Sequence, residues 1–250
     1  MSNNQINKFK KQSKAEVNKQ SKDKKFINIS KKWLLESHRL KYTYHFNWFG
    51  IPIIQYPSDI VGVQEIIYKI KPDLIIETGI AHGGSVIFHS TILDMLSQND
   101  KKKRKVVGID IDIRKHNLKR IKKKYFNKNL ILIEGSSIDQ KVKKRVYKIA
   151  KNKKTIMVIL DSNHSSKHVY EELSFYSKFV TKNSYCIVFD TIVEDLPNKF
   201  VKNRPWSKGN NPLTAVKLFL KENKSFKTDN EIDNKLMISS AKNGFLKRIK

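Results

Sequence analysis

Short apolar runs alternate with helical patterns along most of this chain. The strand candidates are runs of Ile, Val and Leu at 73–77, 105–109, 130–134, 156–160 and 184–189. Continuous runs of this kind are typical of strands buried on both faces of a parallel sheet. Helical spacing fills the gaps between them, at 84–98, 114–125, 139–150 and 166–180. The alternation predicts an α/β fold with a doubly wound, mostly parallel sheet.

The segments on either side of this alternation carry their own start and stop signals. Ser58-Asp59 begins a helical pattern that ends at Lys71-Pro72. Asn211-Pro212 predicts another helix start, with Asn as the cap and Pro in the first turn. The runs 235–239 and 245–249 flank Asn243-Gly244 and predict an antiparallel hairpin at the sheet edge. Residues 191–211 show little periodicity, which is typical of a lid or binding loop.

Composition divides the chain into three parts. Residues 1–25 are rich in Lys, Asn, Gln and Ser and nearly lack apolar residues, so we expect a disordered basic arm. Residues 26–72 concentrate aromatic residues, which predicts a helical, aromatic extension that packs on the domain or borders a substrate site. Residues 73–250 are long enough to bury a full core as one domain.

The charge balance leaves two interpretations open. The chain of 250 residues has 51 basic and 23 acidic residues, a formal net charge of +28. This charge indicates either a polyanionic partner or the Lys-rich composition that an AT-rich genome produces. Cys186 is the only cysteine, which excludes a disulfide framework and a cysteine metal site. Without an apolar run long enough for a membrane span or signal peptide, we expect a cytoplasmic protein.

A glycine-rich turn follows the first predicted strand. Residues 73–85 end in the spacing E-x-G-x-x-x-G-G-S, where glycines let the backbone approach a ligand beside free helix N–H groups. The next apolar run ends in Asp110, where an α/β nucleotide site places the carboxylate that accepts ribose hydroxyls. The spacing matches neither a dinucleotide fingerprint nor a P-loop. It therefore favours a nucleoside ligand without a polyphosphate, and S-adenosylmethionine is the commonest of these.

Polar residues also follow the later strands, at the sheet edge where α/β proteins bind ligands. Asp161 and Asp190 end neighbouring strands, and two carboxylates so close repel unless a cation or proton lies between them. Their oxygens suit Mg²⁺ or Mn²⁺, with Thr191 as a possible third ligand. His164 is either a general base beside them or a polar surface residue, and His168 is expected at the surface.

Taken together, these motifs resemble the cephalosporin hydroxylase family, which contains S-adenosylmethionine-dependent O-methyltransferases acting on sugars, macrolides and related hydroxyls. The resemblance covers residue 40 to the end and implies the seven-stranded, Rossmann-like class I methyltransferase fold. The segments that carry it are 48–52, 55–59, 73–85, 108–112, 161–164 and 190–191.

The resemblance also implies site residues. Asp161 and Asp190 would bind the metal with Thr191, and His164 would be the base. Family members usually have Glu-Asp-Thr after the fifth strand, whereas here Phe189 replaces the Glu, so one metal carboxylate is missing. The residues expected to hold the cofactor are Glu77, Gly79, His82, Gly83, Ser85, Asp110, Asp112, Ser136, Ser137 and Asp161.

The sequence thus predicts an O-methyltransferase for a sugar, glycan or related small molecule, in cell-surface polysaccharide or secondary-metabolite biosynthesis. In the long loop, Trp206 would face a sugar ring, Arg204 a carboxylate or phosphate, and Asn210 the acceptor; alternatively, the loop is a surface segment with a packed Trp. Two other hypotheses remain. One is a nucleic-acid methyltransferase, although this chain lacks the motifs that are usual in that class, and the other is a non-catalytic cofactor-binding protein. A homo-oligomer stays open.

Overall fold

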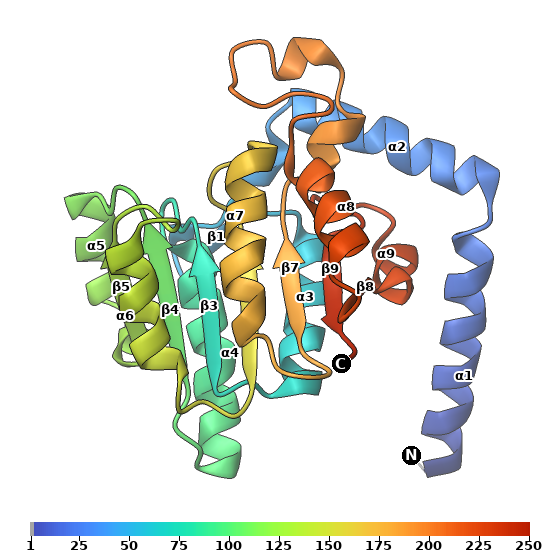
Figure 1. The fold of residues 1–250 in the computed structure, drawn as a ribbon. Helices are drawn as coiled ribbons and strands as arrows, with labels where there is room; N and C mark the ends of the chain where they lie inside the picture. The colour runs from blue at the N-terminus through green and yellow to red at the C-terminus, as the bar shows by residue number, and fades with distance from the viewer. Residues whose placement is uncertain (1–2) are drawn as a thin grey trace.

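A seven-stranded sheet runs through the centre of the computed structural model, which describes residues 3–250 (Figure 1). The spatial order is β5-β4-β3-β6-β7-β9-β8; the first five are parallel, and β9 is antiparallel to both neighbours. This arrangement confirms the predicted mostly parallel sheet with an antiparallel C-terminal strand. The strands are β3 (Leu74–Thr78), β4 (Lys105–Asp110), β5 (Leu130–Glu134), β6 (Ile156–Leu160), β7 (Tyr185–Val188), β8 (Phe226–Thr228) and β9 (Phe245–Arg248).

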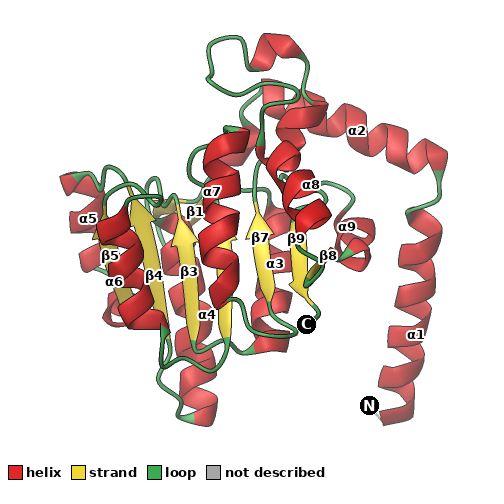
Figure 2. Ribbon diagram, in the orientation of Figure 1, coloured by secondary structure: helices red, strands yellow, loops and turns green. Residues whose placement is uncertain are grey.

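Helices cover both faces of the sheet (Figure 2). Along β3, Leu74 and Ile76 pack with α6, α7 and α8, whereas Ile75 packs with α3 and α4. Because side chains alternate between faces, burial on both sides explains why the strands are continuous apolar runs. The helices are α3 (Pro57–Ile70), α4 (Gly84–Asp100), α5 (Lys115–Lys122), α6 (Gln140–Ala150), α7 (Ser166–Tyr176) and α8 (Pro212–Glu222).

The predicted start of α8 is confirmed at atomic level. The side chain of Asn211 accepts hydrogen bonds from the N–H groups of Leu213 (3.0 Å) and Thr214 (3.3 Å), and Pro212 occupies the first turn. Short 3₁₀ helices complete the connections: η1 (Tyr42–His45), η2 (Tyr125–Asn129), η3 (Ser177–Phe179), η4 (Thr191–Asp195) and η5 (Asn198–Phe200).

The predicted C-terminal hairpin is half wrong. β9 is a strand as expected, but its partners are β7 and β8, and residues 230–236 form α9 (Asn230–Leu236) instead of a strand. Asp229 caps α9 by accepting from the N–H of Glu231, and Leu236 packs against Gly62 of α3. The apolar residues around 236 therefore pack on α3 as part of a helix, and the short β8 is the strand at the edge of the sheet.

The N-terminal region also differs from the expected disordered arm. Its described part forms α1 (Asn3–Gln20), followed by α2 (Lys24–Arg39); residues 1–2 of the predicted arm lie outside the described residues. Lys14 forms a 2.7 Å ion pair with Glu231, and the Gln20 side chain donates to the carbonyl of Asn234 (2.8 Å), so α1 lies against α9. Polar contacts with α9 thus position α1, and the composition of the segment does not reveal such contacts. A small hairpin, β1 (Asn47–Trp48) and β2 (Ile51–Pro52), connects η1 to α3.

Across residues 3–250, none of the helices combines the length and apolar character needed to cross a membrane.

Candidate active site

A cavity of about 470 Å³ opens at the carboxyl ends of the parallel strands. The turns after β3, β4, β5, β6 and β7 all contribute to its wall, as expected for an open α/β sheet. Eight residues that the sequence analysis proposed for the site line it: Gly79, Asp110, Ser136, Ser137, Asp161, His164, Asp190 and Trp206.

Gly79 is required where two turns of this cavity meet. Its φ is +80°, and a Cβ there would lie 2.0 Å from the carbonyl oxygen of Asp161. The absence of a side chain thus lets the turn after β3 contact the turn after β6. Gly83 has a φ of +93°, and a Cβ there would lie 2.3 Å from the side chain of Ile121. The glycine spacing recognised in the sequence is therefore explained by these close approaches.

Asp110 shapes the glycine-rich turn as well as facing the cavity. One carboxylate oxygen accepts from the N–H groups of Ile80 (2.8 Å) and Ala81 (3.1 Å), and the other from the N–H of Asp112 (3.2 Å). The Asp112 side chain is exposed and pairs with Arg114 at 3.3 Å. Asp110 therefore holds the turn after β3 in shape, while Asp112 lies outside the described cavity lining.

Glu77 was predicted to hold the cofactor, but its side chain does not reach the cavity. Its carboxylate lies 2.9 Å from Nδ1 of His89 on α4, and both side chains are fully buried. Glu77 is the fourth residue of β3, and the alternation of the strand directs it toward α4, beneath the turn instead of into it. His82, Gly83 and Ser85 also lie outside the described lining, although Ser85 borders a small adjoining pocket.

The prediction of a surface position for His168 was wrong. His168 lines the cavity, and its Nε2 lies 3.0 Å from Oγ of Ser137 and 3.3 Å from Oγ of Ser162. Ser162 donates to Glu172 (2.7 Å), a fully buried carboxylate that the sequence analysis missed. His168 and Glu172 are four residues apart on α7, and this spacing was the available signal.

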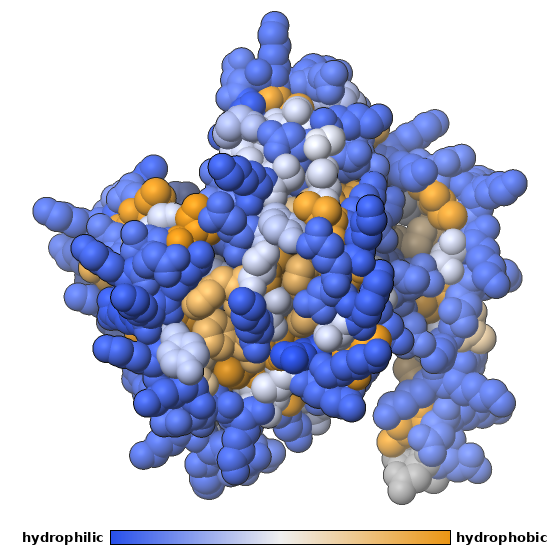
Figure 3. Space-filling view, viewed as in Figure 1, coloured by the Kyte–Doolittle hydropathy of each residue, from blue (hydrophilic) through white to orange (hydrophobic). Residues whose placement is uncertain are grey.

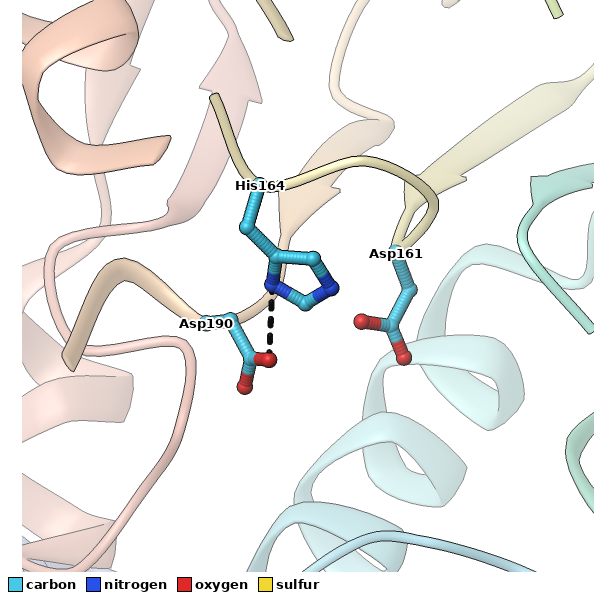
Figure 4. Close-up of side chains that lie close together, drawn as sticks. All are labelled: Asp161, His164 and Asp190. Atoms are coloured by element: carbon cyan, nitrogen blue, oxygen red, sulfur yellow. Dashed lines mark ion pairs between the residues drawn. The ribbon is translucent and has the colours of Figure 1, made fainter. Parts of the chain in front are cut away.

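Asp161, His164 and Asp190 meet on the other side of the cavity (Figure 4). One potential ligand atom from each lies within 4.8 Å of the others. Nδ1 of His164 lies 2.8 Å from a carboxylate oxygen of Asp190, which leaves its second ring nitrogen on the side of Asp161. Asp190 has a φ of +52°, a left-handed conformation that costs energy for a residue with a side chain. The predicted acid–acid–histidine corner is present.

The electrostatics of this corner oppose two charged carboxylates side by side. Burial and the neighbouring charges of Asp190 and Glu77 raise the pKa of Asp161 well above its ordinary value. Burial also opposes ionisation of Asp190, but the attraction and hydrogen bond of His164 hold the pKa of Asp190 low. For His164, burial is outweighed mainly by Asp190, so the pKa of the imidazole is raised. A second negative carboxylate beside Asp190 requires a proton or a metal ion.

Two neighbours of Asp190 do not join the corner. The buried hydroxyl of Thr191 donates to the carbonyls of Ser240 (3.1 Å) and Lys242 (2.7 Å), so the expected third oxygen ligand is turned away. Phe189 is 2% exposed and packs in the core on the α3 and α4 side of the sheet. The carboxylates of Asp161 and Asp190 remain, and carboxylate oxygens suit Mg²⁺ or Mn²⁺ with water or substrate oxygens as the other ligands.

The long loop after β7 covers this corner. The Trp206 ring lies 4.7 Å from the His164 ring at an angle of 32°, and the Arg204 guanidinium lies 5.4 Å from the Trp206 ring. Asn210 has a different role from the one predicted. Its side-chain oxygen accepts from the N–H (3.0 Å) and hydroxyl (2.8 Å) of Ser166, and its amide donates to Pro205 (3.1 Å). Asn210 therefore fastens the loop to the start of α7.

The aromatic extension completes the opposite wall. Tyr44 and Tyr56 line the cavity with His38 of α2, while the Tyr56 ring also packs against Trp33 and Tyr42. Both interpretations of the aromatic segment, packing and bordering the site, apply to Tyr56.

Comparisons with known proteins cover most of the chain. The family model described as Rhamnosyl O-methyltransferase/CmcI matches residues 40–249. Rhamnosyl O-methyltransferase of Mycobacterium tuberculosis (strain ATCC 25618 / H37Rv) is 29% identical over 209 residues, which cover 80% of this chain and 77% of the relative. The enzyme of the same name from Mycobacterium leprae (strain TN) is also 29% identical, covering 80% and 82%.

Solved structures support the fold. The structure described as "CmcI-N160 apo-structure" superimposes with a TM-score of 0.57 at 16% identity, covering 83% of this chain and 77% of its own. The structure described as "cmcI-D160 Mg-SAM" gives a TM-score of 0.54, also at 16% identity, with coverage of 83% and 78%. With the class I methyltransferase fold and the family match in place, the chain belongs to the Rhamnosyl O-methyltransferase/CmcI family and is an S-adenosylmethionine-dependent O-methyltransferase.

Proposed function

We propose that this enzyme methylates a sugar hydroxyl, with a divalent cation bound between Asp161 and Asp190 and His164 as the general base. The observation that carries the proposal is the cluster of these three side chains in the cavity wall, covered by Trp206. The relatives named rhamnosyl O-methyltransferases support a sugar acceptor. The pathway we propose is the biosynthesis of a cell-surface glycan or a glycosylated secondary metabolite.

The cavity has two parts that fit two ligands. The turns that contain Gly79, Asp110 and Ser136 would hold S-adenosylmethionine, because a glycine-lined turn and a carboxylate suit a ribose. The acidic corner fits Mg²⁺ or Mn²⁺, because it brings two carboxylates together and, within residues 3–250, neither forms an ion pair with a lysine or arginine. When bound, the cofactor supplies an activated methyl group and the cation supplies positive charge for a developing alkoxide.

In this proposal, His164 accepts the proton of the acceptor hydroxyl. Asp190 engages Nδ1 at 2.8 Å, which orients the ring and leaves Nε2 to face the cavity. The negative charge of Asp190 also stabilises the imidazolium that forms when Nε2 takes the hydroxyl proton. The residues of this chain therefore supply the base, its orientation and its charge compensation.

The loop around Trp206 excludes water and provides an aromatic face. The Trp206 ring is itself held by the ring of His164 and the guanidinium of Arg204. Flat aromatic surfaces bind the apolar face of a sugar ring, and we propose this role for Trp206. Arg204 would then contact an anionic group on the acceptor only if it leaves the Trp206 ring.

Methyl transfer to defined acceptors tests the proposal. The purified enzyme is incubated with Mg²⁺ and methyl-labelled S-adenosylmethionine, and with rhamnosides, other hexosides, a glycosylated macrolide, a catechol or a ribosomal RNA fragment. We expect label on a sugar hydroxyl, and Trp206→Ala should raise the KM for the sugar while S-adenosylmethionine binding is unchanged. Label on the RNA or the catechol alone would contradict a sugar acceptor.

A further inference from the structure

Exposed hydrophobic side chains are concentrated at the N-terminal end of the described chain. Of the fourteen large hydrophobic residues exposed in the described structure, eight precede residue 50. Five of them, from Ile6 to Trp33, also precede the segment that the family model matches. The eight are Ile6, Phe9, Phe26, Ile29, Trp33, Leu40, Tyr44 and Phe49.

On α2 these residues form one continuous face. Phe26, Trp33 and Leu40 are seven residues apart, so they lie in one row along the helix and just past its end. Their exposed fractions are 42%, 39% and 58%, and Ile29, exposed by 53%, lies beside the row. We call these four residues the α2 apolar row. It borders the face that α2 buries against the domain, which contains Ser30, Leu34 and Ser37.

Basic residues flank the α2 apolar row. Lys25, Lys32 and Arg39 are also seven residues apart and lie on the side of Ile29, with Arg39 held by Glu36 at 2.6 Å. Residues 1–41 contain twelve Lys and Arg residues but only three acidic residues. In Figure 3, hydrophilic residues cover most of the arm made by α1 and α2, and hydrophobic residues emerge between them.

The α2 apolar row adjoins the active site. The Trp33 ring lies 5.2 Å from that of Tyr42 and 5.9 Å from that of Tyr56, and Tyr56 lines the catalytic cavity. The same helix contributes His38 to that lining. A surface that engages the α2 apolar row would therefore lie at the rim of the cavity.

We propose that α2 docks this enzyme on an anionic lipid bilayer, with Phe26, Ile29, Trp33 and Leu40 entering the interface and Lys25, Lys32 and Arg39 at the headgroups. Helices with aromatic and aliphatic residues on one face, bordered by Lys and Arg, lie in the plane of such a bilayer. Tryptophan favours the interfacial region, and each basic residue adds attraction to anionic headgroups. Docking by α2 holds the rim of the active site at the membrane surface.

Two other occupants fit the observations less well. A second copy of this chain would bring a like net charge of +28 against the first, which opposes association. A nucleic acid would use the lysines, but its phosphates do not require a row of exposed aliphatic and aromatic residues. Of the three, only an anionic lipid surface would contact both the α2 apolar row and the basic residues that flank it.

Co-sedimentation with vesicles tests this surface without any methyl acceptor, so its outcome is independent of the proposed function. The full-length protein should sediment with vesicles of phosphatidylglycerol and phosphatidylcholine but not with phosphatidylcholine alone. Phe26→Ser with Trp33→Ser, and separately Lys25→Glu with Lys32→Glu, should each weaken binding by about 10-fold or more. Lys144→Glu with Lys148→Glu on α6, which makes the same charge change, should alter binding by less than about 2-fold.

Circular dichroism and S-adenosylmethionine binding verify that each variant is folded. Unchanged vesicle binding by the Phe26/Trp33 variant would overturn the proposal. The proposal would also be overturned if the wild-type protein did not bind vesicles. In that case, a dimer that Trp33→Ser dissociates would identify a second copy of the chain as the occupant of α2, and an RNA complex that only the lysine variant loses would identify a nucleic acid.

Discussion

The two halves of the cavity are built by different means. On the side that we propose holds the cofactor, the turn after β3 is fixed by its backbone: Gly79 contacts the turn after β6, and Asp110 accepts hydrogen bonds from two N–H groups of the turn after β3. On the proposed acceptor side, Asp161 and His164 of the turn after β6 meet Asp190 and Trp206 of the segment after β7. Ligand binding and chemistry should therefore respond to different substitutions.

His164→Ala should have the largest effect on the acceptor side. Loss of a general base typically lowers the rate by about 10²–10⁴-fold, and S-adenosylmethionine affinity should be nearly unchanged because the cofactor half is left intact. Single-turnover rates and calorimetric binding give the two values. His82→Ala is the matched control, since His82 lies on the cofactor side outside the described lining. Equal rates for His164→Ala and the parent would remove His164 from the mechanism.

Gly79→Ala should most damage the cofactor side. Its φ of +80° disfavours a side chain, and its Cβ would clash with the Asp161 carbonyl at 2.0 Å, so we expect the free energy of unfolding to fall by about 3 kcal/mol or more. Gly209→Ala controls for backbone strain alone, because φ is +78° there and nothing lies within 4 Å of the added Cβ. That substitution should cost about 1 kcal/mol. Equal losses in urea unfolding would show that the close approach is unimportant.

Asp110→Ala should weaken S-adenosylmethionine binding by about 1.5–3 kcal/mol, the usual contribution of hydrogen bonds to a charged group. Since Asp110 also holds the turn, the protein without ligand should lose thermal stability too. Asp112→Ala, two residues away, removes only an exposed carboxylate that pairs with Arg114. If calorimetry gives the same loss for both variants, Asp110 has no special place in the site.

A smaller, pH-dependent effect is expected behind the acceptor side. Asp59 is fully buried and accepts from the N–H (2.9 Å) and hydroxyl (3.0 Å) of Ser240, a residue of the cavity lining. Burial raises the pKa of Asp59 from 3.8 to about 6. The protonated form is therefore favoured on folding, and its stabilisation is complete below the unfolded pKa and is lost as pH rises through about 6.

Urea unfolding of the parent and Asp59→Asn at acidic and alkaline pH measures this contribution. The parent should lose about 2 kcal/mol more than the variant on going from pH 4 to pH 8. Parallel pH profiles for the two proteins would contradict the assignment.

The sequence predicted most of the fold because the signals there are local. Apolar runs such as that of β6, and the Asn211-Pro212 start of α8, carry their structure in adjacent residues. The partner of β9 could not be read in this way, since pairing with β8 depends on tertiary contacts of a three-residue strand. The helical state of α1 likewise depends on polar contacts with α9.

Within the site, the residues after each strand were predictable because parallel strands end at one edge. Their orientations were not. Glu77 points beneath the turn to His89, Thr191 points toward Ser240, and Asn210 holds the start of α7, although each lies within four residues of a cavity residue in the sequence. Conversely, His168 lies in the first turn of α7, and its side chain lines the cavity.

Turnover and cofactor binding in a metal chelator test the central claim most directly. If Asp161 and Asp190 bind a divalent cation beside the acceptor while the turns after β3 to β5 hold the cofactor, removal of the metal should abolish methyl transfer and leave S-adenosylmethionine affinity within about 3-fold. Added Mg²⁺ or Mn²⁺ should restore the rate in the parent but not in Asp190→Asn. Full turnover in the chelator, or loss of cofactor binding together with activity, would contradict the separation of the two halves.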